Sequence, residues 1–338
     1  MKKMFILISL MLLLVILASC KQNTNSIPMI LYNETDASII EIKSNILEKA
    51  QSIITIESYD AQNSQILQNE IIEDVLKENP SVLIINPVDR LGAYTIIDKV
   101  KLEDTPIIFI NREPLVADMN SWNKVYYIGA PAENSAVIQG EMVQEIFGTP
   151  TDLSVYDINN DNIIQLVVLK GEQGHQDAEI RSEVIIDELE AYGYQLDIIA
   201  IEVCDWQELI AYNKVTELYK NIETEVELFI SNNDAMAIGA INALIDLEKI
   251  IDTNNDGVIN HENEPWIPVV GIDGIEEAIE LVEQGYLYGT VINDSEAMSD
   301  ALIELAKALQ DGTDLSTLSY ELTDGKYIWV DYKRYIPE

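Results

Sequence analysis

Short apolar runs rich in β-branched residues alternate with longer amphipathic segments along almost the whole chain. This alternation of strands and helices predicts parallel sheets with helices on both faces. The runs fall into two series of similar length, so the sequence predicts an α/β protein with two doubly wound lobes. The predicted strands are Pro28–Tyr32, Ile53–Glu57, Val82–Asn86, Ile107–Ile110 and Val125–Ile128, then Ile163–Leu169, Leu196–Glu202, Glu227–Ser231, Pro268–Ile272 and Leu287–Ile292. The predicted helices include Ile39–Gln51, Gln65–Glu78, Ala132–Phe147, Ala178–Tyr192 and Asn233–Leu247.

The first twenty residues predict export and lipid attachment. Lys2 and Lys3 precede an apolar run over residues 4–18, and Cys20 follows it. A positive start, a short apolar stretch and small residues before a cut site are typical of a secretory signal. Residues 1–20 resemble a lipoprotein signal with its lipobox, in which Cys20 becomes the lipidated first residue; a plain transmembrane anchor is the alternative. We therefore expect an extracytoplasmic, lipid-anchored protein with residues 21–26 as its tether.

The chain is strongly acidic, with 59 Asp and Glu residues against 20 Lys and Arg residues and a formal net charge of −39. Such a charge repels nucleic acid and anionic lipid headgroups, so neither is expected as a ligand. It suits a neutral ligand, or a protein that holds cations. Only Cys204 remains as a thiol after Cys20, so no internal disulfide is expected.

Polar residues follow most of the predicted strands. In doubly wound folds ligands bind beyond the carboxyl ends of the strands, and amides, carboxylates and cations there can hydrogen-bond a ligand with many hydroxyls. At any single position the alternative is a helix cap. The polar strand ends are residues 33–36, 111–113, 171–175, 232–234, Asp273 and 293–294.

Several of these segments resemble the bacterial periplasmic galactose/glucose-binding protein family. The most specific is Gly171–Arg181, which reads GEQGHQDAEIR, and the next is Asn232–Ala240 at a predicted strand-to-helix turn. The resemblance covers essentially the whole mature chain. The further matching segments are Phe109–Pro114, Ile138–Gly140 and Gly289–Asp294.

The resemblance implies two lobes joined by a three-stranded hinge that closes on sugar. Its crossovers would lie near Ala130, Asn293 and Trp329. One lobe would then combine residues 27–130 with 294–328, and the other would combine 131–293 with 329–338.

The resemblance also implies the ligand-binding residues. Amides and carboxylates bind neighbouring hydroxyls in pairs, and the planar fork of an Arg serves two oxygens. Trp206 would stack on the C–H face of the sugar ring, with a core aromatic as the alternative. His175 would donate to a ring substituent, although its position alone fits a surface or helix-start residue. The implied set is Asp36, Asn111, His175, Asp177, Arg181, Trp206, Asn233, Asp273 and Asn293.

One departure concerns the second aromatic wall that the family usually places two residues after Asp36. Here that position is Ser38, followed by Ile39, which could supply an aliphatic lid. Asp36 is retained, and in the family it meets the hydroxyl that distinguishes glucose from galactose. Both sugars are expected ligands, and another pentose, hexose or signalling sugar is the alternative.

The segment 157–165 places side-chain oxygens at positions 1, 3, 5 and 9 of an EF-hand-like loop. The family resemblance implies that Glu227 from a distant strand completes the site, and oxygen-only ligands indicate calcium with a structural role. An Asx-rich turn without metal is the alternative. The implied ligands are Asp157, Asn159, Asp161, Ile163 through its carbonyl, Gln165 and Glu227.

A second segment, 252–260, repeats this pattern with Gly257 at position 6. Position 12 is the neutral Asn263, flanked by Glu262 and Glu264, so a second ion would bind more weakly. The alternative is an acidic, solvated loop. The candidate ligands are Asp252, Asn254, Asp256, Val258 and Asn260.

The predicted function is capture of a monosaccharide for uptake by an ABC transporter, not catalysis. A glycosidase could use Asp36 and Asp273 as a carboxylate pair, yet a site of multiply bonded groups lowers the ground state, which favours binding. A lac-repressor-like regulator would need a DNA-binding headpiece. The expected partners are the permease membrane subunits, with a chemoreceptor or sensor as a further candidate, and the expected state is a monomer.

Overall fold

The computed structural model describes residues 26–337, so the predicted signal and Cys20 lie outside the described residues. Contacts between Cα atoms divide the chain into two units. The first contains the residues up to Asn33, Leu47–Tyr127 and Ala301–Tyr327, and the second contains Glu34–Ile46, Ile128–Asp300 and the residues from Ile328 onward. No helix in the described part of the chain is long and apolar enough to cross a membrane.

The first unit is built on a six-stranded sheet with the order β13-β5-β4-β3-β1-β2. The strands β1, β2, β3 and β4 pair in parallel. The strands are β1 Ser26–Leu31, β2 Thr55–Asp60, β3 Leu83–Ile85, β4 Ile107–Ile110, β5 Val125–Gly129 and β13 Tyr327–Trp329. Its helices are α3 Gln65–Leu76, η1 Arg90–Gly92, α4 Ala93–Leu102, α5 Val116–Met119 and η2 Leu315–Thr317. Two helices, α2 Ala37–Ala50 and α11 Ser295–Asp311, begin in the second unit and end in the first.

The second unit has a six-stranded sheet with the order β14-β12-β11-β10-β8-β9, parallel except for β14. Its strands are β8 Ile164–Lys170, β9 Leu196–Val203, β10 Leu228–Ser231, β11 Val269–Asp273, β12 Gly289–Asn293 and β14 Tyr332–Tyr335. Its helices are α6 Ala132–Phe147, α7 Gln176–Tyr192, α8 Glu208–Asn221, α9 Asp234–Asp246 and α10 Glu276–Glu283. A small hairpin pairs β6 Gly148–Thr149 with β7 Asp152–Leu153.

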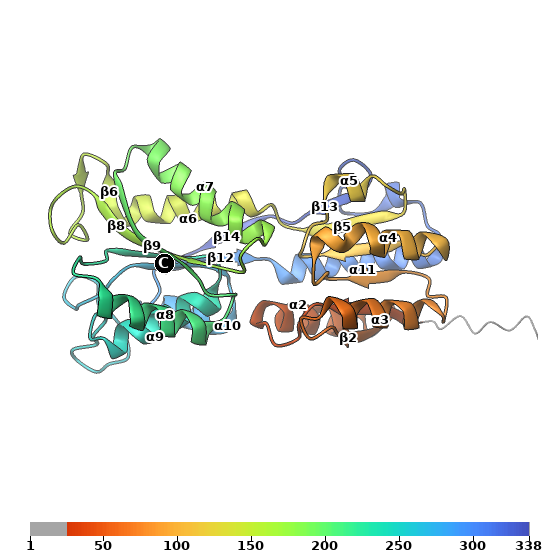
Figure 1. The fold of residues 1–338 in the computed structure, drawn as a ribbon, viewed down its shortest axis with the longest axis horizontal. Helices are drawn as coiled ribbons and strands as arrows, with labels where there is room; N and C mark the ends of the chain where they lie inside the picture. The colour runs from red at the N-terminus through yellow and green to blue at the C-terminus, as the bar shows by residue number, and fades with distance from the viewer. Residues whose placement is uncertain (1–25, 338) are drawn as a thin grey trace, which may run out of the picture. The chain divides into compact units, whose positions relative to one another are not determined.

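The alternating sides of each strand explain why helices cover both faces of the second sheet. In β8, Leu166 and Val168 pack with residues of α6 and α7, whereas Val167 and Leu169 pack with residues of α8, α9 and α10. Figure 1 shows α6 and α7 on one face of this sheet and α8, α9 and α10 on the other. Every residue of β8 is buried, as expected for a central strand of a doubly wound sheet. The predicted fold class, two α/β lobes with parallel sheets, is confirmed.

The units divide the chain differently from the boundaries that the resemblance implied. Glu34–Ile46 and residues 294–300 group with the second unit rather than the first. These two segments are joined by Ser295, whose hydroxyl donates to Glu41 Oε1 at 2.6 Å and accepts from Asn45 Nδ2 at 2.9 Å. These bonds fasten the first turns of α2 to the start of α11.

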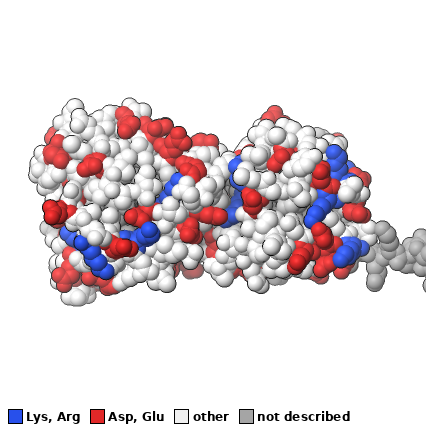
Figure 2. Space-filling model, viewed as in Figure 1, with Lys and Arg blue, Asp and Glu red and all other residues white. Residues whose placement is uncertain are grey.

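Acidic side chains are spread over the visible face of both units, and Lys and Arg are fewer there (Figure 2). This distribution agrees with the composition of the chain, which has 59 acidic and 20 basic residues.

Candidate functional site

Both sheets reverse their strand order at the same place in their topology. The reversal lies between β1 and β3 in the first sheet and between β8 and β10 in the second. Loops that leave such a reversal point diverge to opposite faces, so backbone and side-chain groups there can surround a ligand. The loops concerned carry Asn86 in the first unit and the segments Gly171–His175 and Asn232–Asn233 in the second.

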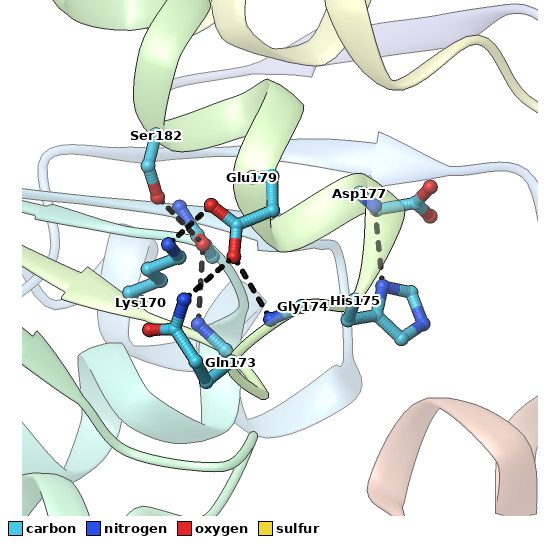
Figure 3. Close-up of polar contacts among 9 residues, drawn as sticks. Lys170, Gln173, Gly174, His175, Asp177, Glu179 and Ser182 are labelled. Atoms are coloured by element: carbon cyan, nitrogen blue, oxygen red, sulfur yellow. Dashed lines mark hydrogen bonds and ion pairs between the residues drawn. The ribbon is translucent and has the colours of Figure 1, made fainter. Parts of the chain in front are cut away.

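The loop after β8 is fastened by Glu179, a residue of the matching motif that was not expected to bind ligand. Its carboxylate accepts from Lys170 Nζ at 2.5 Å, from the Gly174 amide at 2.8 Å and from Gln173 Nε2 at 3.0 Å (Figure 3). His175 and Asp177 point away from this cluster in Figure 3.

His175 begins α7, because its Nδ1 accepts from the Asp177 amide at 3.2 Å. His175 is therefore a helix-start residue, as its position in the sequence alone suggested.

Trp206 lies in the loop between β9 and α8 and has a φ of +65°. Its ring covers Gly171 so closely that a Cβ at 171 would come within 2.3 Å of Trp206 Cη2. The His175 ring meets it edge-on, with centroids 5.1 Å apart and an interplanar angle of 80°. The indole also packs against the hydrophobic cluster of the second unit. Trp206 is therefore partly a core aromatic, the alternative to a stacking role that the sequence left open.

Arg181 is a buried cation, 4% exposed, whose hydrogen bonds go to two neutral oxygens. Nη1 donates to the carbonyl of Asn232 at 2.6 Å and Nη2 to the phenol of Tyr332 at 2.8 Å. Nε is buried without a partner among the described residues. Burial lowers the pKa of the guanidinium, but the nearby Tyr332, Asp177 and Asp273 outweigh burial and raise it. Arg181 is therefore charged and retains donor capacity.

Asp273 ends β11 with a φ of +133°, a strained backbone for a residue with a side chain. The strain is held by Asp234, whose Oδ2 accepts from the amides of Gly274 at 2.6 Å and Ile275 at 3.1 Å. The other oxygen of Asp234 accepts from Thr290 Oγ1 at 2.7 Å.

Burial acts in the same direction on the pKa values of Asp234 and Asp273. Burial raises the pKa of Asp234 to about 6. Burial also raises the pKa of Asp273 well above its usual range, against the opposing effect of Arg181. The role of Asp234 could not be read from the sequence, because the turn that Asp234 stabilises lies 40 residues further along the chain.

The remaining asparagines of the second unit line the same strand ends. Asn233 caps α9, with Oδ1 accepting from the Met236 amide at 2.9 Å, and its Nδ2 donates to the Trp206 carbonyl at 3.3 Å. Asn293, 8% exposed, has a buried Oδ1 with no partner among the described residues. A buried amide oxygen without a donor costs free energy that a ligand hydroxyl would recover.

In the first unit, Asn111 follows β4 with a φ of +62°. Its carbonyl accepts from the Tyr127 phenol at 3.0 Å, and its Oδ1 accepts from Asn86 Nδ2 at 3.4 Å. The guanidinium of Arg112 lies 3.8 Å from the Tyr32 ring centroid, and its Nη1 donates to the Val88 carbonyl at 2.6 Å.

Asp36 caps α2, since its Oδ1 accepts from the Ile39 amide at 3.1 Å. Asp36, His175 and Asn233 therefore each cap the helix that follows them. Asn111 and Asp273 are not helix caps, and they share a positive φ with Trp206. Strained residues of this kind cluster at functional sites.

The structure brings together most of the predicted ligand set in the second unit. Ring contact joins His175 to Trp206, and Asn233 bonds the Trp206 backbone. Asp177 and Asp273 both lie close enough to raise the pKa of Arg181. Asn293 opposes Tyr332, the phenol partner of Arg181, in the β12–β14 ladder. Asn111 belongs to the first unit.

The first EF-hand-like loop folds around its own carboxylates. Asp157 accepts from the amides at positions 5 and 6 of the loop, at 3.2 and 2.9 Å. Glu227, 1% exposed, bridges the loop by accepting from the amides of Ile158 at 2.6 Å and Gln165 at 3.3 Å. Burial raises the pKa of Glu227, and Asp157 raises it further. A nearby cation would relieve both effects.

The second EF-hand-like loop has the same hydrogen-bond pattern. Asp252 accepts from the amides at positions 5 and 6, at 3.3 and 2.8 Å. Glu264 accepts from the amides of Thr253 at 2.7 Å and Asn260 at 2.9 Å, which are positions 2 and 9 of the loop. Glu264 therefore occupies the place that Glu227 has in the first loop. Glu264 is at position 13, whereas the EF-hand pattern has its acid at position 12.

Trp266 lies between the two loops. Its ring stacks on His261 of the second loop, with centroids 3.7 Å apart, and meets the edge of Tyr156, next to the first loop, at 5.5 Å. Within residues 26–337, no three His, Cys, Asp or Glu side chains converge in a group that could hold a metal ion. Side-chain amides and a backbone carbonyl would have to complete either site, as calcium permits.

Two doubly wound units with buried polar groups at their strand ends define a class of protein, the small-molecule receptors of the periplasmic binding type. The sequence matches the periplasmic binding protein domain over residues 30–314. It is 33% identical over 291 residues to the D-galactose/methyl-galactoside binding periplasmic protein of Haemophilus influenzae, covering 85% of this chain and 82% of that protein.

Solved structures show the same fold. A myo-inositol-bound solute binding protein of Bacillus halodurans aligns with a TM-score of 0.74 and 23% identity, covering 93% of this chain and 95% of the other. A D-allose-bound periplasmic solute binding protein of Actinobacillus succinogenes aligns with a TM-score of 0.76 and 19% identity, covering 93% and 98%.

The chain belongs to the periplasmic binding protein family and is related to its galactose-binding members. It is an extracytoplasmic sugar-binding component of an ABC transporter, and it is not an enzyme.

Proposed function

We propose that the chain captures D-glucose or D-galactose and delivers it to its ABC permease. The observation that supports this most directly is Arg181, a buried cation with unused donors beside Asp177 and Asp273. A pyranose presents neighbouring hydroxyls that accept from the guanidinium and donate to the carboxylates at once. The neutral sugar also suits a chain whose net charge of −39 disfavours anions.

The choice of glucose and galactose rests on the 33% identity to a galactose-binding relative and on the retained Asp36. In this proposal the ligand-binding residues of the sequence analysis keep their roles, with Trp206 as the stacking wall. The serine at position 38 leaves that sandwich one-sided. Other relatives of the fold bind myo-inositol and D-allose, so these are the competing ligands to test.

Calorimetric titration of ligand-free protein tests the proposal. The protein is unfolded, dialysed and refolded so that no copurified sugar remains, then titrated with D-glucose, D-galactose, D-allose, D-ribose and myo-inositol. Tightest binding of D-glucose or D-galactose is expected. Tightest binding of another compound would replace the proposed ligand, and no binding of any monosaccharide would contradict the proposed function as a whole.

We propose that the first loop binds a structural calcium ion. Its ligands would be the side chains of Asp157, Asn159, Asp161, Gln165 and Glu227 and the carbonyl of Ile163. The buried Glu227 supports this, because its raised pKa and its neighbour Asp157 both favour an added cation. The second loop, with Glu264 in the place of Glu227, is proposed to bind a second ion.

We also propose that Cys20 carries the lipid anchor, that the mature protein works as a monomer, and that a chemoreceptor or sensor is a second partner after the permease. The lipobox-like segment before Cys20 supports the first of these.

A further inference from the structure

Tyr332 is a residue that neither the motif segments nor the expected ligand set includes. It is the first residue of β14, which pairs antiparallel with β12 so that Tyr332 opposes Asn293. Its side chain is 8% exposed and belongs to the hydrophobic cluster beneath α6 and α7. The phenol oxygen at the end of this otherwise apolar residue accepts from Arg181 Nη2 at 2.8 Å.

The contacts of Arg181 explain why such a partner is needed. An arginine side chain has many rotamers, so ordering its guanidinium requires fixed contacts. Nη1 is held by the backbone carbonyl of Asn232 and Nη2 by Tyr332. Two anchors from different elements, Asn232 directly after β10 and Tyr332 on β14, fix both the position and the plane of the guanidinium. Removing one anchor leaves the plane free to turn about the other.

The chemical nature of the anchor matters as well. None of the ion pairs formed within residues 26–337 includes Arg181, and both of its hydrogen-bond acceptors are uncharged. A carboxylate in the place of Tyr332 would neutralise the guanidinium and compete with a ligand for it. A phenol orients the group without neutralising it, so the charge and the buried, unpartnered Nε remain for a ligand.

We propose that Tyr332 is a positioning residue for ligand recognition, which holds the Arg181 guanidinium in the plane that a sugar requires. This inference rests on the proposed function in so far as the ligand is a sugar with adjacent hydroxyls. Tyr332 acts through Arg181 and is not itself assigned a ligand contact.

The test is a double-mutant cycle on sugar affinity with Tyr332→Phe, Arg181→Lys and the double variant. Tyr332→Phe removes only the phenol oxygen and is expected to weaken binding about 10-fold, the usual effect of losing a hydrogen bond to a charged group. In the Arg181→Lys background the same change should cost less than twofold, because lysine has no plane to orient. The matched control is Tyr335→Phe on the same strand, whose phenol contacts Glu283, and it should bind like wild type.

The possible results separate the two proposals. If wild-type protein binds no monosaccharide, the proposed function fails. If wild type binds and Tyr332→Phe binds equally well, or loses affinity equally in both backgrounds, Tyr332 is not a positioning residue.

Side-chain nuclear magnetic resonance of the arginine Nη groups provides a readout that does not depend on the sugar. Hindered rotation of the Arg181 guanidinium is expected in wild type and Tyr335→Phe, and faster rotation in Tyr332→Phe. Unchanged rotation in Tyr332→Phe would overturn the proposal even if that variant is less stable.

Discussion

The Trp206 indole covers Gly171, and any side chain at position 171 would overlap it, since a Cβ there would lie 2.3 Å from Cη2. The first glycine of the motif GEQGH is therefore required by an aromatic ring from another loop, 35 positions further along the chain. One ring face is occupied by this contact, and the edge of His175 borders the ring.

Trp206→Ala is expected to lower sugar affinity by about 1–3 kcal/mol, because it removes an aromatic stacking face at a binding site. Titration calorimetry measures the loss. Trp206→Phe keeps a ring and should recover part of the affinity. Unchanged affinity in Trp206→Ala would assign the indole wholly to the core that it partly joins.

Asp234→Asn is expected to flatten the pH dependence of stability. The pKa of Asp234 is about 6 in the folded protein, above its value near 4 in an unfolded chain, so the folded state binds the extra proton. The resulting stabilisation is present at low pH and is lost as pH rises through 6. Between pH 5.0 and 7.5 this loss is about 1.4 kcal/mol in wild type and should be absent in the variant.

Urea unfolding at pH 5.0, 6.0 and 7.5 measures this difference. Asp273, whose pKa is also raised, titrates in both proteins, and because Asp234 contributes to that raise, the variant also brings the pKa of Asp273 closer to its usual range. Parallel stability curves for wild type and Asp234→Asn would contradict the expectation.

Chelation of calcium is expected to lower the melting temperature, because an ion bound only by the folded state stabilises that state by mass action. Glu227→Gln should reduce the difference between calcium-loaded and chelated protein. Differential scanning calorimetry with and without chelator measures both effects. Identical melting of wild type in the two conditions would indicate an Asx-rich turn without metal.

Two calcium ions per chain are expected in native mass spectrometry if both loops bind. The variant Asp252→Ala/Asp256→Ala should retain one ion, and so should Glu264→Gln at low calcium concentration. Because the Glu264 carboxylate accepts from the amides at positions 2 and 9, a second ion would depend on it as a first ion would depend on Glu227. One ion in wild type and in all variants would leave the second loop as an acidic, solvated segment.

Cys20→Ser is expected to release the protein from the membrane while leaving sugar affinity unchanged, since the change lies before the first strand. Detergent partitioning of whole cells expressing wild type and variant provides the measurement. Continued membrane association after the same signal processing would argue against lipid attachment at Cys20.

Much of the fold could be predicted because its signals are local. Strands such as β8 are continuous apolar runs, and the sequence also placed polar residues at their carboxyl ends. The edge strands β13 and β14 lack this signal, because YIW is only three residues long and YKRY has two basic residues in its centre, so both strands depend on their partners β5 and β12.

The supporting residues of the site could not be predicted for a related reason. Asp234 fastens a turn at Gly274, Tyr332 meets Arg181 across 151 residues, and Glu264 reaches its loop from position 13. In the last case a tight turn, in which the Glu264 amide donates to the Asn260 carbonyl at 2.9 Å, brings the carboxylate back to the loop. Each relation depends on tertiary structure that no spacing rule describes.

The interleaving of the two units sets the order in which the chain can become native. The first unit lacks β13 until Tyr327 has been made, and the second lacks β14, with its pairing to β12 and its buried Tyr332, until the last residues emerge. These late strands join the edges of the two sheets, and their pairing with β5 and β12 connects segments far apart in the sequence, which slows folding.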